Sequence, residues 1–181
     1  MRVISGIYKH RRFDVPTTFK ARPTTDFAKE SLFNILNNYL DYDAEPTALD
    51  LFAGTGSISV ELLSRGCSRV VSVESEREHH AFICRVMREV GTERSFPIRG
   101  DVFLFLRRCR EQFDFIFADP PYDLPQLTTL PDLVFRHNLL KPDGLFVLEH
   151  GKKQHFDAHP HFAEHRAYGS VNFSFFTATA P

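Results

Sequence analysis

The sequence predicts an α/β fold with a mostly parallel central sheet, an antiparallel C-terminal hairpin and a short N-terminal β extension. After residue 46, runs of β-branched and aromatic residues alternate with helical patterns, which is typical of the crossover units of a parallel sheet. Near the end of the chain, two β-rich runs flank Gly169 and Ser170, which favours a hairpin. A chain of 181 residues is long enough for one domain with a single substantial core.

Residues 1–22 predict a small basic β extension in front of a main domain that covers residues 23–181. Two β-rich stretches, 2–6 and 12–16, flank a loop with Lys9, Arg11 and Arg12. Six Lys and Arg against one acid give this end five net positive charges, whereas the whole chain carries a net charge of -1. A basic segment on an acidic body is typical of proteins that contact a phosphate backbone. The alternative is an ordinary solvated tail.

A helix is predicted from Thr25 or Asp26 to about Leu40. Pro23 interrupts the chain before it, and Thr25 or Asp26 supplies an N-cap. The apolar residues that follow share one helical face, which can pack on a sheet. They are Ala28, Leu32, Ile35, Leu36 and Tyr39.

The remaining elements follow from hydrophobic patterns and turn residues. The predicted parallel strands are 48–52, 69–74, 96–99, 113–118 and 144–150, and the hairpin strands are 164–168 and 171–177. The predicted helices are about 57–65, 76–90, 102–108 and 127–137. Gly66 and Gly91 suit left-handed caps at the ends of two of these helices.

The composition argues against several classes of protein. No apolar run is long enough to cross a bilayer and the first residues lack the apolar core of a signal peptide, so we expect a cytoplasmic protein. Three widely spaced cysteines indicate reduced thiols and not a disulfide framework. Five histidines between residues 150 and 165 match no metal-ligand spacing, so they predict a solvated connection and no metal site.

A glycine turn after the first strand of the sheet predicts a cofactor site. Gly54 and Gly56 let the backbone turn sharply and approach a ligand. Glu74 lies about 20 residues further on, at a strand end, where nucleotide-binding folds place the partner of a ribose diol. Asp101, at the next strand end, can accept a hydrogen bond from an adenine amine. The predicted cofactor-binding residues are Asp50, Phe52, Ala53, Gly54, Thr55, Gly56, Glu74, Ser75, Asp101 and Val102.

Two other interpretations of the glycine turn remain. The same pattern occurs in a strand-to-helix turn that holds no ligand. A nicotinamide-dependent dehydrogenase would have Gly or Ala at the third position of the fingerprint, where this chain has Ser59. No hydride-transfer motif follows the turn, so the sequence disfavours a dehydrogenase.

Residues 119–122, which we call the acceptor segment, predict a site for a planar amine. The two prolines fix the backbone and remove two N–H donors, so carbonyl oxygens here can face a ligand. A carboxylate and a rigid carbonyl can take both hydrogens of an amine, and a tyrosine offers a face on which a base can stack. The predicted catalytic residues are therefore Asp119, Pro120, Pro121 and Tyr122. The alternative is an acidic turn without a ligand.

Taken together, these motifs closely resemble the RsmD family of bacterial 16S ribosomal RNA guanine-N2 methyltransferases. The resemblance spans nearly the whole chain, and the segment in front of the first helix is its most particular part. It implies a Rossmann-like class I methyltransferase fold, S-adenosylmethionine as methyl donor and a guanine exocyclic amine as acceptor. The stretches that carry it are Arg22-Pro23-Thr24-Thr25-Asp26, Lys29-Glu30-Ser31-Leu32-Phe33-Asn34, Asp50-Leu51-Phe52-Ala53-Gly54-Thr55-Gly56 and Asp119-Pro120-Pro121-Tyr122.

The resemblance also implies a partner, which is 16S ribosomal RNA or the assembling small ribosomal subunit. Residues 5–12 depart from the family, because they replace a glycine-richer and more basic stretch. We expect RNA contacts from Lys9, Arg11, Arg12, Arg22 and Thr24, and we expect a monomer. The alternatives are methylation of another nucleobase amine, in adenine or cytosine of RNA or DNA, and a non-catalytic RNA-binding assembly factor on the same fold.

Overall fold

The computed structural model describes residues 1–19 and 25–179, which form a seven-stranded sheet with helices on both faces. The strand order is β3-β2-β1-β4-β5-β7-β6. Neighbouring strands among β1 to β5 are parallel, whereas β7 is antiparallel to both β5 and β6, which confirms the predicted sheet and hairpin. The strands are β1 (Thr47–Leu51), β2 (Arg69–Glu74), β3 (Ser95–Arg99), β4 (Phe113–Ala118), β5 (Leu140–His150), β6 (Phe162–Tyr168) and β7 (Val171–Thr177).

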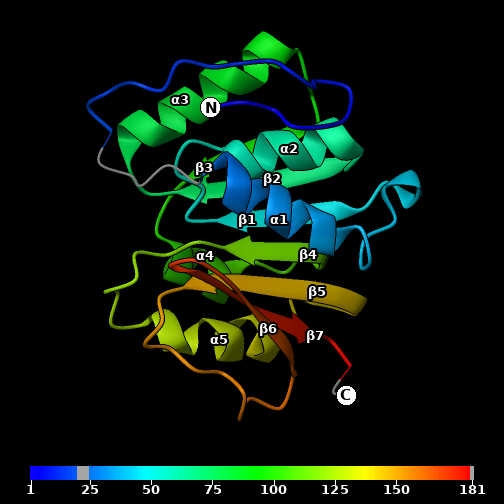
Figure 1. Cartoon of the computed structure of the whole chain (residues 1–181), viewed down its shortest axis with the longest axis vertical. Helices are drawn as coiled ribbons and strands as arrows, with labels where there is room; N and C mark the ends of the chain where they lie inside the picture. The colour runs from blue at the N-terminus through cyan, green and yellow to red at the C-terminus, as the bar shows by residue number, and fades with distance from the viewer. Residues whose placement is uncertain (20–24, 180–181) are drawn as a thin grey trace.

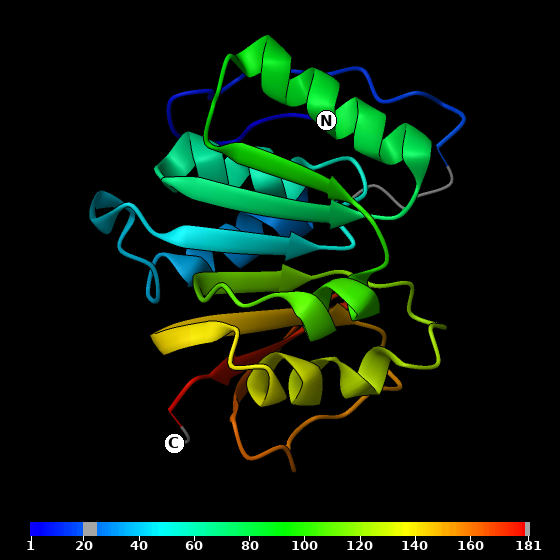
Figure 2. The ribbon, with the colours of Figure 1, turned by 180° about the vertical axis from the view of Figure 1, so that it is seen from behind.

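The helices divide between the two faces of the sheet. Figure 1 shows α1 (Asp26–Leu36) and α2 (Ser57–Arg65) in front of the sheet, and α3 (Arg77–Val90) packs on the same face. Figure 2 shows the other face, with α4 (Val102–Arg108) and α5 (Leu130–Arg136). Short 3₁₀ turns occur at η1 (Tyr42–Ala44) and η2 (Leu127–Thr129). Each face has its own cluster of buried apolar side chains, so both faces of the central strands are covered, as their apolar sequences predict.

Most element bounds agree with the sequence prediction, but β5 begins at Leu140 instead of Gly144, and two helices differ for local reasons. α1 ends at Leu36 instead of about Leu40, because the chain then tightens into 3₁₀-type bonds, from the Asn38 N–H to the Ile35 carbonyl at 2.9 Å and from the Tyr39 N–H to the Leu36 carbonyl at 3.0 Å. The helix expected over 127–137 begins as 3₁₀ turn η2, and its α-helical part has Pro131 in the first turn. A proline there lacks the N–H that would continue a helix from the preceding turn.

The N-terminal arm (residues 1–19) packs closely on the helices. The predicted hairpin forms a single β-bridge, between Arg2 and Arg12, while Val3 and Phe13 are buried in the core shared by α1, α2 and α3. The predicted domain boundary at residue 22 lies outside the described residues. Nowhere in the two described ranges is there a helix long and apolar enough to span a membrane.

α2 holds the arm through its backbone and through a buried acid. The Glu61 carboxylate is fully buried and accepts hydrogen bonds from the N–H groups of Ile4 at 2.8 Å and Ser5 at 2.9 Å. A Cβ added to Gly6 would lie 1.8 Å from the carbonyl oxygen of Ser64, so only glycine allows this close approach. The arm is therefore fixed to α2 over its first six residues.

Candidate cofactor and base-binding site

Glu74 is the last residue of β2 and Asp119 directly follows β4, and these are the two strands that flank β1. Leu51 of β1 pairs with Val73 of β2 and with Ala118 of β4, and each acid follows its strand partner by one residue. The N–H of Asp119 also bonds to the carbonyl oxygen of Leu51 at 3.3 Å, so this register extends past the strand end. Neighbouring strands are about 4.8 Å apart, so the two acids lie roughly 10 Å apart at the same edge of the sheet.

The glycine turn (residues 52–56) joins β1 to α2 between these two acids. Gly54 and Gly56 have φ angles of +55° and +73°, in the left-handed region that favours glycine. A Cβ on Gly56 would approach the Ile83 side chain at 3.0 Å, whereas one on Gly54 would meet nothing nearer than the Phe52 carbonyl at 3.9 Å. Phe52 itself has a φ of +58°, which is a strained value for a side-chain-bearing residue. Strain of this kind is concentrated at ligand sites.

Glu74 holds the glycine turn and keeps capacity for a ligand. Its carboxylate is largely buried; one oxygen accepts the Gly54 N–H at 2.7 Å and the other accepts the Glu76 N–H at 2.8 Å. The His79 Nδ1 lies 4.0 Å from the second oxygen, which is beyond hydrogen-bond distance. A carboxylate offers about four lone-pair positions, so two bonds leave room for two ribose hydroxyl donors. The residues present at this tip therefore fit the sugar of a nucleoside cofactor.

Asp101 and its neighbours form the next part of the edge. One Asp101 oxygen caps α4 by accepting the Leu104 N–H at 2.7 Å, which fixes the direction of an otherwise exposed carboxylate. Val102 is buried. The rings of Phe103 and Phe52 pack edge to face, with their centroids 6.2 Å apart. An acid beside an apolar wall suits an adenine, which presents an amine on a flat apolar ring.

Asp50 lies beneath the turn and does not face solvent. It is fully buried, and one of its oxygens accepts both the backbone N–H of Ser59 at 3.1 Å and the Ser59 hydroxyl at 2.5 Å. Burial raises the pKa of the Asp50 carboxyl to about 7, although the bonds from Ser59 oppose this shift. Asp50 thus fixes the start of α2 through its two hydrogen bonds with Ser59. Thr55 and Ala53 lie in the turn above it, and Ser75 is exposed at the tip of β2.

The acceptor segment is fixed against the end of β5. Asp119 is half-buried, Pro120 is buried and Pro121 is exposed. The Tyr122 hydroxyl donates to the Glu149 carboxylate at 2.6 Å, which sets the direction of the tyrosine ring. Glu149 is a buried acid that the sequence analysis missed. The sequence pattern that could have identified Glu149 is an acid near the end of an apolar strand, because ligands bind at the carboxyl edge of such a sheet.

The structure does not bring the basic loop of the arm to the strand tips. The Ile7 N–H bonds to Ser64 at 2.8 Å and the Arg11 guanidinium bonds to the Glu89 carbonyl at 3.0 Å. Both acceptors lie in the last turns of α2 and α3, at the amino-terminal edge of the sheet (Figure 1). α3 alone is roughly 20 Å long, so the loop with Lys9 and Arg12 is distant from Glu74. The predicted contacts Arg22 and Thr24 lie outside the described residues.

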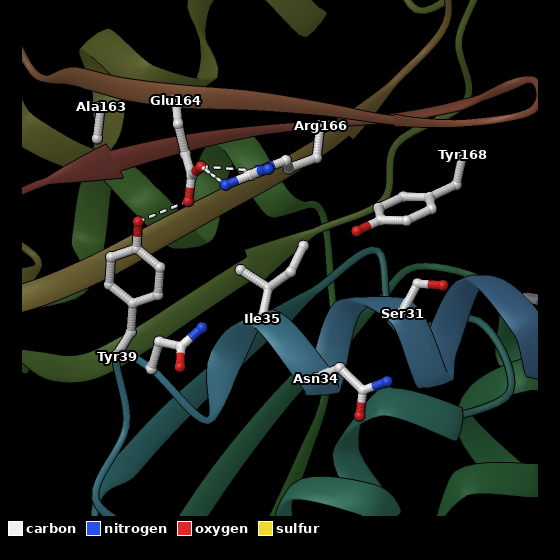
Figure 3. A pocket seen from close by; sticks show the side chains of 9 residues that line it. Ser31, Asn34, Ile35, Tyr39, Ala163, Glu164, Arg166 and Tyr168 are labelled. Atoms are coloured by element: carbon white, nitrogen blue, oxygen red, sulfur yellow. Dashed lines mark hydrogen bonds and ion pairs between the residues drawn. The ribbon is translucent and has the colours of Figure 1, made fainter.

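A separate polar groove runs between α1 and β6. Figure 3 shows its walls, where the Tyr39 hydroxyl and the Arg166 guanidinium both bond to the Glu164 carboxylate at 2.6 Å. Desolvation and the bond to Glu164 raise the pKa of Tyr39 to about 12. The groove has a volume of about 760 Å³. Its lining residues include neither Glu74 nor the acceptor segment, so we do not assign it to the cofactor site.

Comparisons with known proteins identify the family and the fold of the chain. The family described as "Conserved hypothetical protein 95" matches residues 1–177. Ribosomal RNA small subunit methyltransferase D of Haemophilus influenzae is 31% identical over 153 residues, which cover 82% of this chain and 78% of that protein. A solved structure of a hypothetical protein from Thermus thermophilus has a TM-score of 0.83 at 27% identity, covering 97% of this chain and 98% of its own.

A more distant structure shows the fold alone. The Podospora anserina methyltransferase PaMTH1, solved with S-adenosylhomocysteine bound, has a TM-score of 0.59 at 17% identity. The match covers 69% of this chain and 53% of that one. Together the structural neighbours confirm the predicted Rossmann-like methyltransferase fold.

Proposed function

The chain belongs to the family described as conserved hypothetical protein 95, the RsmD family of ribosomal RNA methyltransferases, and we propose that it methylates the exocyclic N2 amine of a guanine in 16S ribosomal RNA. One observation carries the proposal: Glu74 and Asp119 follow paired positions on the two strands that flank β1. A cofactor held by one acid and an amine held by the other would therefore meet at one edge of the sheet.

On this proposal the cofactor is S-adenosylmethionine, which supplies an electrophilic methyl group on a sulfonium. Glu74 would accept hydrogen bonds from the ribose hydroxyls, since its two bonds to backbone N–H groups leave acceptor capacity. Asp101 would accept from the adenine amine, beside the apolar wall of Phe52 and Phe103. The open space at Gly54 lets the backbone of the turn approach the rest of the cofactor.

The acceptor segment would orient the target amine. The Asp119 carboxylate and the Pro120 carbonyl can accept the two amine hydrogens, which directs the nitrogen lone pair out of the base plane toward the methyl group. As positive charge develops on the nitrogen, the Asp119 carboxylate stabilises it, and the surplus proton leaves to that carboxylate or to water. No activated nucleophile is needed, because the donor is already reactive. Positioning and electrostatics therefore supply most of the rate.

The target base must leave its stack before it can reach Asp119. This costs a few kcal/mol, and least for a nucleotide that is already unpaired. The Tyr122 ring offers a stacking surface that offsets part of this cost, and the bond from its hydroxyl to Glu149 keeps the ring in place. An unpaired guanine in a loop of the small-subunit RNA would meet these requirements.

Labelling and nucleoside analysis test the proposal. Small-subunit particles from a strain that lacks this gene are incubated with the protein and methyl-tritiated S-adenosylmethionine, and the RNA is digested to nucleosides. We expect the label in N2-methylguanosine of the 16S RNA. Label in methylated adenosine or cytidine would overturn the guanine assignment. Tight cofactor binding without label in any RNA would overturn the enzyme and indicate an assembly factor instead.

A further inference from the structure

A small cavity lies between the 151–157 loop and the β6–β7 hairpin. It has a volume of about 190 Å³. Residues of the loop form one wall, and residues of β6 and β7 form the other. The lining residues are Lys152, Gln154, His155, Phe156, Asp157, Phe162, His165, Asn172 and Ser174.

The loop that forms this cavity is tied to the acceptor segment. The Gln154 amide donates to the Tyr122 carbonyl at 3.1 Å. Gly151 lies so close to the Tyr122 ring that an added Cβ would be 3.2 Å from a ring carbon. The position of the loop therefore depends on the same tyrosine that we propose stacks on the target base. Gln154 both lines the cavity and bonds to Tyr122, so it joins the cavity to the acceptor segment.

The hairpin wall of the cavity is ordered by buried hydrogen bonds. The His150 Nδ1 lies 2.8 Å from the Gly151 carbonyl, which can only accept, so this nitrogen carries the proton. Burial lowers the pKa of His150, which keeps the ring neutral, and its Nε2 then accepts the Ser174 hydroxyl at 2.8 Å. Across the strand pair, the His165 Nε2 bonds to the Asn172 amide oxygen at 3.1 Å. His165 thus holds a fixed position at the cavity.

The lining is rich in groups that bind anions. It contains one lysine, Lys152, and two imidazoles, His155 and His165, against one acid, Asp157. An ammonium beside an imidazole N–H is a donor set that favours a phosphate. The cavity is too small for a second folded partner, and it has room for a phosphodiester group.

We propose that this cavity binds a backbone phosphate of the RNA next to the target nucleotide and so sets the position of the target base on Tyr122. The inference rests on the proposed function, because it takes RNA as the substrate. It gives the histidines of the 151–165 region a role that their spacing did not predict. Lys152 supplies the charge and His155 a hydrogen bond to a phosphate oxygen, whereas the Nε2–H of His165 is already donated to Asn172, so His165 forms the wall of the cavity.

A matched pair of lysine variants tests the proposal. Lys152→Ala and Lys153→Ala remove the same charge from adjacent exposed positions, but only Lys152 lines the cavity. We expect Lys152→Ala to raise the KM for RNA about tenfold and to lower kcat, with S-adenosylmethionine affinity unchanged. The slope of log affinity against log salt should fall by about one, because one phosphate contact is lost. Lys153→Ala should change the KM less than about twofold. Equal effects of the two variants would overturn the cavity as a specific site.

A second measurement does not depend on turnover, and so separates this inference from the proposed function. The imidazole NMR signals of His155 and His165 are followed in the full chain while a single-stranded RNA oligonucleotide or inorganic phosphate is added. We expect both signals to shift with RNA at concentrations far below those needed with phosphate, and His155→Gln to weaken RNA binding. Shifts with phosphate but not with RNA would indicate a free anion site and overturn the proposal, as would no shift with either.

Discussion

Two buried glutamates, Glu61 and Glu74, use their oxygens in opposite ways. Glu61 on α2 is surrounded by donors from the protein itself. Its oxygens accept the N–H groups of Ile4 and Ser5 and the Arg65 guanidinium at 2.9 Å, and the Lys29 ammonium lies 3.6 Å away. The acceptor capacity of this carboxylate is filled by internal partners. Glu61 therefore joins the arm, α1 and α2 into one unit and has no capacity for a ligand.

Glu74 at the tip of β2 is also buried, but among the described residues it accepts two hydrogen bonds. Both come from the backbone of the loops that surround the site, at Gly54 and Glu76. Burial of an acid therefore does not by itself distinguish a structural role from ligand binding. The number of hydrogen-bond donors that the protein supplies does distinguish these roles. A buried carboxylate with unfilled acceptor positions lowers stability unless a ligand or water supplies the missing donors.

The largest effect should come from replacing Glu61, whose acceptor positions are filled by the protein itself. Glu61→Ala leaves the Lys29 ammonium buried without its carboxylate and removes the anchors of the arm. We expect the free energy of unfolding to fall by about 3–5 kcal/mol, as for other buried pairs that lose one partner. Urea unfolding measures it, and Glu61→Gln gives a second variant that keeps the volume. Glu30→Ala, on the exposed face of α1, should change stability by less than about 0.5 kcal/mol. A loss as small as that of the control would show that Glu61 is not the anchor.

A smaller effect, on cofactor affinity, is expected at Glu74, which has unfilled acceptor positions. Glu74→Ala should raise the Kd for S-adenosylmethionine about 10- to 100-fold, because two charge-assisted hydrogen bonds to the ribose are lost. Isothermal titration calorimetry measures this, and thermal unfolding shows whether the glycine turn is still formed. Glu78→Ala, an exposed acid in the first turn of α3, is the matched control. Unaltered cofactor affinity in Glu74→Ala would remove Glu74 from the ribose site.

A third effect should be a change in how stability depends on pH. The pKa of Asp50 is raised from 3.8 to about 7 in the folded chain. Between these values the folded state binds a proton that the unfolded state has lost, so the free energy of unfolding falls as the pH rises and levels off above about 7. We expect this contribution, on the order of 1 kcal/mol per pH unit, to be absent in Asp50→Asn. Urea unfolding from pH 5 to 8 compares the two proteins, and parallel curves would refute the assignment.

The sheet could be predicted from the sequence because its strands are β-rich runs separated by turn residues, and the central ones, β1, β2 and β4, are also mostly buried. The tip acids could also be predicted, since Glu74 and Asp119 directly follow such runs. The packing of the arm could not. Charged residues such as Lys29 and Glu61 are usually exposed when they occur on helices. No local sequence pattern shows that these two are buried together.

The position of the basic loop could not be predicted for a related reason. The charges of Lys9 and Arg12 indicate contact with phosphate but do not encode where the arm docks. That position is set by tertiary contacts, such as the bond from Arg11 to the end of α3. Glu149 was missed because its role depends on Tyr122, 27 residues away in the chain. Local patterns thus predicted where each strand ends but not what packs beside it.

The proposal that Glu74 binds the cofactor and Asp119 binds the target amine is tested most directly by Asp119→Ala. The affinity for S-adenosylmethionine is measured by calorimetry in the same preparation as the rate of methyl transfer to small-subunit particles. Asp123→Ala, an exposed acid just beyond the acceptor segment, is the control. We predict a cofactor Kd within about twofold of the unaltered protein and a kcat lower by about 10²- to 10³-fold. Equal loss of cofactor affinity and rate, or transfer at the unaltered rate, would contradict the account.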